Sequence, residues 1–559
     1  MQRWPAFRWL ASYDPRQNLQ GDVRAGITVA VMLIPQGLAY AMLAGLPPVV
    51  GLYSAVFPLL AYAAFGTSRQ LAVGPVAMDS LLVAVGVAAI APTSSAEYVA
   101  AATILAALVG GLQVAMGALR LGFLVNFLSQ PVVNGFTSAA AVIIGSSQLP
   151  HLLGVRLETS ARTHEVLSGL LTGLDQTHAW TAGLGLGSVA VLLLLKRYAP
   201  RVPAALLLVA LATLLSFSLG LEHRGVTVVG GVPAGLPGPT LTLLDAERIT
   251  ALLPTAVTIA LVGFLEAISV AKVFASKNGY EVSANRELVS LGLANLAAYL
   301  FRGYPVTGGF SRTAVNAEAG ARSLMASVIS AAVVALAWWK LTPLFTHLPK
   351  AALAAIVLVA VGGLVDVRAP ARLWRIKPTD AALVVVTFGL TLALGMQLGI
   401  AGGVLVSLGL FIYRTTRPHT AELGRLPGTE VYRNLKNFPE AQAVPGLLIL
   451  RVDASFYFGN VAFFKDRLDA LLRERPHEVC RVLLDASSIN DLDSSAEQAL
   501  REAVRRLRAN GKDLYLANVK GPVREVMKRA GLWGELGEDH IFLDIHSAVQ
   551  RIGAVSNGL

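Results

Sequence analysis

The sequence predicts a polytopic α-helical membrane protein followed by a soluble α/β domain. Of its 559 residues, 54% are hydrophobic and 14% are charged, with a mean hydropathy of +0.60. Soluble globular proteins carry roughly 25% charged residues. Apolar runs of membrane-spanning length recur between residues 24 and 413, and the composition becomes that of a soluble domain after Arg417. These observations predict a transmembrane domain over 24–417.

Twelve apolar runs are long enough, or nearly so, to cross a hydrocarbon core of about 30 Å. They lie near residues 24–44, 48–66, 97–119, 122–147, 178–195, 202–220, 250–271, 287–301, 323–339, 351–365, 380–396 and 398–413. Two shorter segments, 76–91 and 310–321, follow glycine-rich breaks and are too short or too polar to span alone. The total of fourteen transmembrane elements is even, so both termini are expected on the same side of the membrane.

The distribution of charge indicates which side that is. Residues 421–559 contain 19 basic and 19 acidic residues, so the net charge of +11 belongs to the membrane part. Its basic residues are scattered singly between apolar runs, which favours cytoplasmic loops over nucleic-acid binding. Both termini are therefore predicted to be cytoplasmic, with residues 1–23 forming an amphipathic lead-in that has no cleavable signal. The single cysteine, Cys480, excludes an intrachain disulfide framework and a Cys-based zinc site.

The two halves of the membrane part are faintly similar. Laying segment 27–41 over 257–271 pairs Gln36 with Glu266. Laying 73–83 over 307–317, which needs nearly the same shift, pairs Gly74 with Gly308 and Met78 with Arg312. Such internal similarity is typical of transporters built from inverted repeats. The sequence therefore predicts seven plus seven elements.

The glycine breaks have a physical consequence. A Gly-Pro or Gly-Gly pair stops the backbone before a new helix begins, and the first N–H groups of that helix lack intrahelical partners. In hydrocarbon each such group costs several kcal/mol unless it lines a cavity or meets a ligand. Two inverted short helices would point their N-termini at each other, which predicts an anion site.

Several motifs resemble the sulfate permease (SulP) family of anion transporters. They are "PVVGLYSAVFPLLAYAAFGTSR" (48–69), "IPQGLAYAMLAGLPP" (34–48), "SQPVVNGFTSAAA" (129–141) and "GGFSRTAVN" (308–316). The resemblance covers essentially the whole chain. It implies a fold like that of uracil permeases, in which a core domain moves against a gate domain, and it implies a homodimer.

The resemblance also implies where the substrate binds, namely between the N-termini of the third and tenth helices. Carried over residue by residue, the substrate-binding positions are Gln36, Tyr40, Val76, Ala77, Phe310, Ser311 and Arg312. Gln36 and Tyr40, four residues apart, share one helical face and can donate hydrogen bonds to an oxyanion. Arg312 is expected to contact the anion or supply positive potential, with snorkelling at a helix end as the alternative.

Two acidic residues are candidates for coupling transport to a cation gradient. Glu266 lies in the middle of an apolar helix, where a carboxyl can carry a proton or join a sodium site. The alternative role is a buried counter-charge or hydrogen-bond donor. Asp79 lies one turn inside the first short helix, and either titrates during transport or serves as a cap or ion-pair partner of Arg312.

The carboxy-terminal part resembles the STAS domain shared with anti-sigma factor antagonists. We expect a linker over 418–430 and the domain over 431–555, with strand-like runs "GLLILRV", "CRVLLDA" and "DLYLANV". Helical patterns alternate with these runs near 460–474, 494–509 and 521–530. The resemblance maps the phosphorylated serine of the antagonists to Ser494. Asp493 and Ser494 are also ordinary helix-capping residues, which is the alternative.

The sequence thus predicts a transporter and not an enzyme, in the inner (plasma) membrane, without cofactor or metal. The expected substrate is an anion such as sulfate, bicarbonate or a dicarboxylate such as fumarate, carried by proton symport with alternating access. Sodium symport and anion exchange remain open, as does a membrane-tethered STAS signalling scaffold with a cytosolic protein partner. Nucleobase transport on the same fold is disfavoured by Arg312 beside a helix N-terminus.

Overall fold

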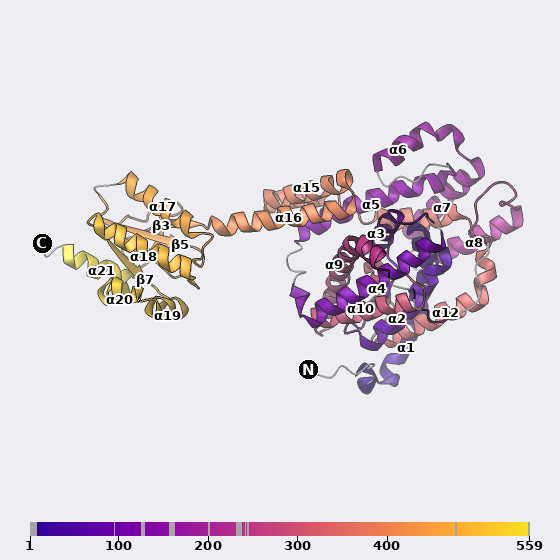
Figure 1. Cartoon of the computed structure of the whole chain (residues 1–559), viewed down its shortest axis with the longest axis horizontal. Coiled ribbons are helices and arrows are strands. Elements are labelled where there is room, and N and C mark those ends of the chain that lie inside the picture. Colours follow the sequence, from indigo (N-terminus) through magenta and orange to yellow (C-terminus); the bar gives the residue numbers. More distant parts are fainter. Residues whose placement is uncertain are drawn as a thin grey trace. The chain divides into compact units, whose positions relative to one another are not determined.

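The protein consists of two compact units, which divide between Ser407 and Leu408. The computed structural model describes residues 8–93, 95–123, 129–155, 163–199, 202–230, 237–240, 242, 245–475 and 478–556. Figure 1 shows a helical first unit and a second unit that contains a sheet flanked by helices.

All fourteen elements predicted for the membrane part have a helical counterpart. The helices are α1 (Pro15–Leu43), α2 (Pro48–Phe65), α3 (Ala77–Ala88), α4 (Ala96–Ala118), α5 (Gln130–Leu153), α7 (Ala179–Tyr198), α8 (Ala204–Leu219), α9 (Ala246–Lys277), α10 (Ala284–Leu300), α11 (Phe310–Glu318), α12 (Met325–Phe345), α13 (Lys350–Gly362), α15 (Pro378–Leu394) and α16 (Met396–Thr416). Part of the run predicted at 122–147, residues 124–128, lies outside the described residues. Among the described helices, seven are long and apolar enough to cross a membrane.

Four short helices in the described part of the first unit were not predicted. They are η1 (Arg8–Ser12), α6 (Thr163–Thr172), η3 (Leu174–Gln176) and α14 (Ala369–Ile376). Each is too short to contain the long apolar run by which the membrane elements were recognised.

The predicted lead-in 1–23 is partly helix, because α1 begins at Pro15. Asp14 caps α1 by accepting a hydrogen bond from the Arg16 N–H at 2.9 Å. Further along the helix, the buried Asp22 carboxylate accepts the backbone N–H groups of Arg322 and Ser323 at 2.7 and 3.0 Å. These bonds tie α1 to the segment before α12, and so the first helix extends beyond its apolar run.

A second buried carboxylate, Glu287 of α10, organises the segment between α2 and α3. It accepts hydrogen bonds from the Tyr62 hydroxyl and from the Thr67 and Ser68 N–H groups, at 2.8, 2.8 and 3.1 Å. Backbone N–H groups of the sequence "GTSR" (66–69) therefore bind the Glu287 carboxylate, which comes from the other half of the membrane unit. A carboxylate that receives several backbone N–H groups can stay buried, because its charge is compensated.

The second unit is built on a six-stranded sheet of order β4-β3-β5-β6-β7-β8. Its strands are β3 (Thr420–Arg425), β4 (Tyr432–Asn434), β5 (Leu447–Val452), β6 (Arg481–Asp485), β7 (Asp513–Ala517) and β8 (Ile541–Phe542). Its helices are α17 (Val461–Glu474), α18 (Ser494–Ala509), α19 (Gly521–Arg529), α20 (Leu532–Leu536), η4 (Glu538–His540) and α21 (Ile545–Ser556). Strands β5 to β8 are parallel, while β3 pairs antiparallel with both β4 and β5.

The sheet corrects the extent of the predicted linker, since residues 420–425 within 418–430 form β3. Alternate residues of β5 face opposite sides: Leu448 and Leu450 join the core beneath α17 to α20, whereas Leu447 and Ile449 pack with α21. Strand β3 is short and carries polar residues, so only its pairing with β5 identifies it as part of the domain.

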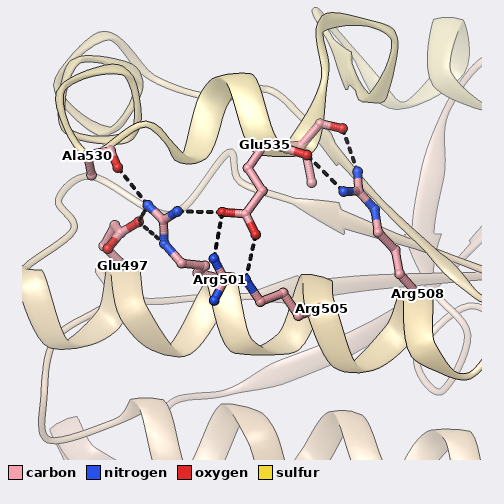
Figure 2. Close-up of polar contacts among 7 residues, drawn as sticks. Glu497, Arg501, Arg505, Arg508, Ala530 and Glu535 are labelled. Atoms are coloured by element: carbon pink, nitrogen blue, oxygen red, sulfur yellow. Dashed lines mark hydrogen bonds and ion pairs between the residues drawn. The ribbon is translucent and has the colours of Figure 1, made fainter.

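Three arginines of α18 hold α20 in place, as Figure 2 shows. Arg501 bonds to Glu497, Glu535 and the Ala530 carbonyl, and Arg505 donates to Glu535 at 2.7 Å. Arg508 donates to the carbonyls of Glu535 and Leu536, both at 2.8 Å. The last carbonyls of this very short helix thus find partners outside the helix.

Neutralising Glu535 tests this cluster. We expect Glu535→Gln to lower the opening free energy of α20 by about 1 kcal/mol, as for a small network of partly exposed ion pairs. Hydrogen exchange of the α19 and α20 amides in the full-length protein measures this change. Glu525→Gln on α19 is the control, because no contact of that side chain contributes to the cluster.

The same cluster predicts a pH dependence. Hydrogen bonds from Arg505 lower the pKa of Glu535. The stabilisation of α20 by ionised Glu535 is therefore complete above the ordinary Glu pKa of about 4.3. It is lost as the pH falls below that value through the lowered pKa. Protection of α20 that is unchanged between pH 7 and pH 3.5 would contradict this prediction.

Candidate anion-binding site

The two short helices α3 and α11 begin at one crossing of the chain. Strand β1 (Val73–Gly74) precedes α3, and β2 (Thr307–Gly308) precedes α11. The strands pair antiparallel, with Val73 opposite Gly308 and Gly74 opposite Thr307. The repeat alignment matches Val73 with Thr307 and Gly74 with Gly308. Replacing each residue by its match turns the pair Val73–Gly308 into the pair Thr307–Gly74, which is the other pair of the ladder. The strand register therefore agrees with the repeat alignment. The two helix starts are related by local two-fold symmetry.

Neither helix start carries a side-chain cap. The N-cap residues are Val76 for α3 and Gly309 for α11, and neither provides a side-chain hydrogen bond. The Ser80 N–H bonds to the Val76 carbonyl at 3.0 Å, and the Thr313 N–H bonds to the Gly309 carbonyl at 3.1 Å. The N–H groups ahead of these bonds have no intrahelical acceptor, which makes both helix starts suited to an anion.

Arg312 reaches from one helix start to the other. Its side chain is 2% exposed, and Nη1 donates to the Pro75 carbonyl and, at 3.4 Å, to Gln36 Oε1. Its Nε and Nη2 atoms are buried without a hydrogen-bond partner among the described residues. The alternative of snorkelling is wrong, because the side chain does not reach solvent. Two free donors of a buried guanidinium are available to an oxyanion.

Glycines make room for this guanidinium. A Cβ at Gly309 would lie 3.2 Å from Arg312 Nη2 and 3.3 Å from Val76 Cγ1. A Cβ at Gly74 would lie 3.5 Å from the same nitrogen. The breaks therefore start the helices and also leave space for the arginine side chain.

Side chains tie the two helix starts to each other. Thr313 on α11 accepts the Ala72 N–H at 3.1 Å, and Asn316 donates to the Gln70 carbonyl at 2.8 Å. In return, the Ser80 hydroxyl on α3 lies 3.0 Å from the Tyr304 hydroxyl. These buried bonds join segments from the two halves of the membrane unit, so the site is held as one body.

Asn295 is a supporting residue that the sequence analysis missed. Its Oδ1 accepts the Val306 N–H at 2.8 Å, and its Nδ2 donates to the Val306 carbonyl at 3.1 Å. Gln113 of α4 accepts from the same amide at 3.0 Å. Asn295 thus fixes the backbone just before β2. An asparagine within the apolar run "LGLANLAAYL" was the available signal.

The predicted substrate-binding residues fall into two groups. Gln36, Tyr40, Val76 and Ala77 are buried around Arg312, together with Gly309. Phe310 is 56% exposed and Ser311 is also exposed, so their side chains lie at the open side of the α11 start. The structure brings the first group together and leaves the second group accessible.

The two coupling candidates lie next to this site, and each has at least one buried carboxyl oxygen without a hydrogen-bond partner among the described residues. Glu266 on α9 has a buried Oε2 with no partner among the described residues, and both carboxyl oxygens of Asp79 are equally unpartnered. Asp79 therefore neither caps α3 nor pairs with Arg312, which corrects that alternative. The charges of Asp79 and Arg312 each interact with that of Glu266.

The helix start does not offset the burial of an Asp79 carboxylate. A helix N-terminus stabilises a negative charge by at most about 2 kcal/mol. Burying an ion without a partner costs several kcal/mol. The helix start alone therefore does not compensate an ionised carboxylate at this position.

In the second unit, Asp493 and Ser494 occupy the start of α18. Asp493 is the N-cap, accepting the Ala496 N–H at 2.7 Å and the Phe458 N–H at 2.8 Å. Ser494 is exposed on the first turn. The structural role predicted for Asp493 is confirmed, and the Ser494 hydroxyl is accessible.

Each of the two units matches a known protein family. The sulfate permease family matches residues 19–387, and the STAS domain matches residues 438–548. The chain is 39% identical over 562 residues to "Sulfate transporter 4.1, chloroplastic" of Arabidopsis thaliana, covering 98% of this chain and 82% of that protein. It is 36% identical over 535 residues to a probable sulfate transporter of Mycobacterium tuberculosis, covering 96% and 95%.

Solved structures show the same fold. The murine Slc26a9 anion transporter in its inward-facing state superimposes with a TM-score of 0.91 at 27% identity, covering 98% of this chain and 93% of that one. The transmembrane domain of the cyanobacterial bicarbonate transporter BicA matches with a TM-score of 0.59 at 25% identity, covering 70% and 96%. The predicted fold class is thereby confirmed.

The space around Arg312 can be tested by filling it. We expect Gly309→Ala to raise the half-saturating concentration of the transported anion about tenfold, equivalent to about 1.4 kcal/mol, because the new methyl group displaces the guanidinium. Concentration-dependent uptake into proteoliposomes measures the change. The control is Gly111→Ala on α4, where a Cβ meets no atom within 4 Å. Equal half-saturation in both variants would contradict the prediction.

Proposed function

The chain belongs to the sulfate permease family of anion transporters, and we propose that it is a proton-coupled sulfate symporter working by alternating access. It is a multi-pass membrane protein that carries an anion. One observation carries the proposal for the binding site: a buried arginine with two unpartnered donors, among the described residues, lies between two uncapped helix starts. The names of its relatives support sulfate as the substrate.

The site supplies donors of three kinds to the anion. The N–H groups at Val76 and Ala77, and at Phe310 and Ser311, come from the two helix starts, where an oxyanion is favoured. The free nitrogens of Arg312 supply positive charge. Gln36 and Tyr40 border the same space from α1 and complete the polar lining. The exposed Phe310 and Ser311 mark the direction of entry.

Bicarbonate is a second candidate substrate. The similarity to the transmembrane domain of a bicarbonate transporter favours it. Both anions present oxygen atoms that accept hydrogen bonds, but sulfate carries two charges and four oxygens. Competition by unlabelled bicarbonate against labelled sulfate uptake distinguishes the two substrates. A bicarbonate transporter would prefer bicarbonate, so unlabelled bicarbonate would inhibit sulfate uptake more strongly than unlabelled sulfate at the same concentration.

Glu266 is the proposed coupling residue. One of its carboxyl oxygens is buried, and its charge interacts with that of Arg312. When Glu266 is ionised, it neutralises the positive potential that an anion needs. When it is protonated, that potential is free. Proton uptake and anion binding therefore support each other, which is the requirement for symport.

The remaining proposals concern the assembly of the whole protein. We place both termini in the cytoplasm on the distribution of basic residues. We further propose the plasma membrane as the location. We propose a homodimer, as the relationship to the SLC26 transporters suggests. The STAS domain is a regulatory or partner-docking module, in which the exposed Ser494 is the candidate phosphorylation site.

Removing the guanidinium tests the binding site. Arg312→Ala is expected to lower sulfate uptake into proteoliposomes at least about a hundredfold, because a buried charged contact to the anion contributes about 3 kcal/mol or more. Arg312→Lys retains the charge but lacks the fork of donors, and is expected to bind weakly. The control is Lys272→Ala, an exposed cation on α9. Uptake by Arg312→Ala with unchanged affinity would refute the site.

Neutralising Glu266 tests the coupling. Glu266→Gln is expected to retain sulfate binding but to weaken accumulation driven by an inwardly directed proton gradient, because the amide cannot take up the proton that Glu266 carries. Equilibrium exchange of labelled sulfate measures binding and translocation without coupling. The control is Glu247→Gln in the exposed first turn of α9. Accumulation that ignores pH but follows a sodium gradient would favour sodium symport instead.

A further inference from the structure

We propose that Asp79 is a second proton-binding site, so that two protons enter with each sulfate ion. The inference rests on the proposed proton-coupled transport and specifies its stoichiometry. It starts from a difference between the two repeats. Asp79 and Thr313 occupy equivalent positions in the repeat alignment that the β1–β2 register supports.

The two equivalent side chains have different tasks. Thr313 accepts the Ala72 N–H at 3.1 Å and donates to the Gly309 carbonyl at 2.7 Å, so it holds the backbone before β1. The counterpart of Ala72 in the other repeat is Val306. Its N–H is already bonded to Asn295 Oδ1 at 2.8 Å. Asp79 is therefore not needed to hold the backbone.

The carboxyl of Asp79 is sealed in the protein interior. It is 0% exposed, and neither oxygen has a hydrogen-bond partner among the described residues. A Cβ at Gly263 of α9 would lie 3.1 Å from Asp79 Oδ2, so the carboxyl packs against the α9 backbone. The nearby Thr307 hydroxyl donates to the Gly263 carbonyl at 2.6 Å and is thus engaged elsewhere.

These surroundings suit a proton better than a metal cation. A proton occupies no additional volume and needs no coordination shell. Hard cations in proteins require about six oxygen ligands, whereas the carboxyl packs closely against the α9 backbone at Gly263. A proton moving to Asp79 needs only a brief water contact when the core shifts during alternating access.

The titratable and charged groups around Asp79 set the charge of the site. Glu266 faces Asp79 from α9, and Tyr304 faces it from the segment before β2. Arg312 on α11 and Tyr40 on α1 interact in turn with Glu266 and Tyr304. With both carboxyls protonated, Arg312 leaves the site with one positive charge. Each proton that leaves subtracts one charge, so the form with both protons attracts the anion most strongly.

The charge count gives a second consequence. Sulfate carries two negative charges, so its entry with two protons moves no net charge across the membrane. With a single proton, one net negative charge would move inward with each cycle. An inside-negative membrane potential should therefore leave transport by the native chain unaffected, and should slow transport by a chain that lacks the Asp79 proton site.

The test measures stoichiometry in proteoliposomes of the full chain. Labelled sulfate flux is brought to zero by opposing a sulfate gradient with a pH gradient, and the balance point gives protons per sulfate. We expect two for the native chain and one for Asp79→Asn, with potassium–valinomycin potentials slowing only the variant. Asp79→Thr, which copies Thr313, provides a second variant should the asparagine fail to fold. Glu97→Gln, in the exposed first turn of α4, is the matched control.

The outcomes separate this inference from the proposed function. One proton per sulfate in the native chain, with that proton lost in Glu266→Gln, would overturn the Asp79 site but leave proton symport intact. Two protons per sulfate in both Asp79 variants would also overturn it. A native chain whose flux balance ignores pH altogether would refute the proposed proton coupling itself.

Discussion

The structure of the membrane unit depends on the antiparallel pairing of its two short strands, β1 and β2. Backbone N–H and C=O groups cannot remain unpaired in hydrocarbon, yet the chain breaks twice at this depth. The antiparallel pairing of β1 and β2 satisfies part of the broken backbone, and Thr313 and Asn295 bond the groups beside it. The first N–H groups of α3 and α11 have no intrahelical acceptor and no side-chain cap. These helix starts are the basis of the proposed anion site.

The two repeats share a backbone arrangement and differ in side chains. On one side, Met78 and Asp79 begin α3, while Arg312 and Thr313 occupy the same positions in α11. The arginine fills the space at the centre and reaches the opposite break. The aspartate carboxyl receives no hydrogen bond from any described residue. The two helix starts therefore share one backbone arrangement but carry different charges.

The second unit is stabilised by a different kind of interaction. Its parallel strands are covered by helices on both faces, and arginines of α18 fasten α20 from outside. These contacts are partly exposed, so they respond to pH and salt in a way that the buried bonds of the membrane unit do not. The first turn of α18 in this unit carries the exposed Ser494.

The sequence by itself determined the helical elements, the two breaks and the position of Arg312. Apolar length, glycine pairs and turn residues act locally, so they can be recognised without knowing what the chain contacts. It did not reveal β3, α14 or the role of Asn295, because a short polar strand or a single amide has meaning only through its partner. The tertiary structure decided that Thr313 is bonded while Asp79 is not. The difference depends on the backbone N–H group in the opposite half of the membrane unit. The Ala72 N–H bonds to Thr313, whereas the equivalent Val306 N–H already bonds to Asn295.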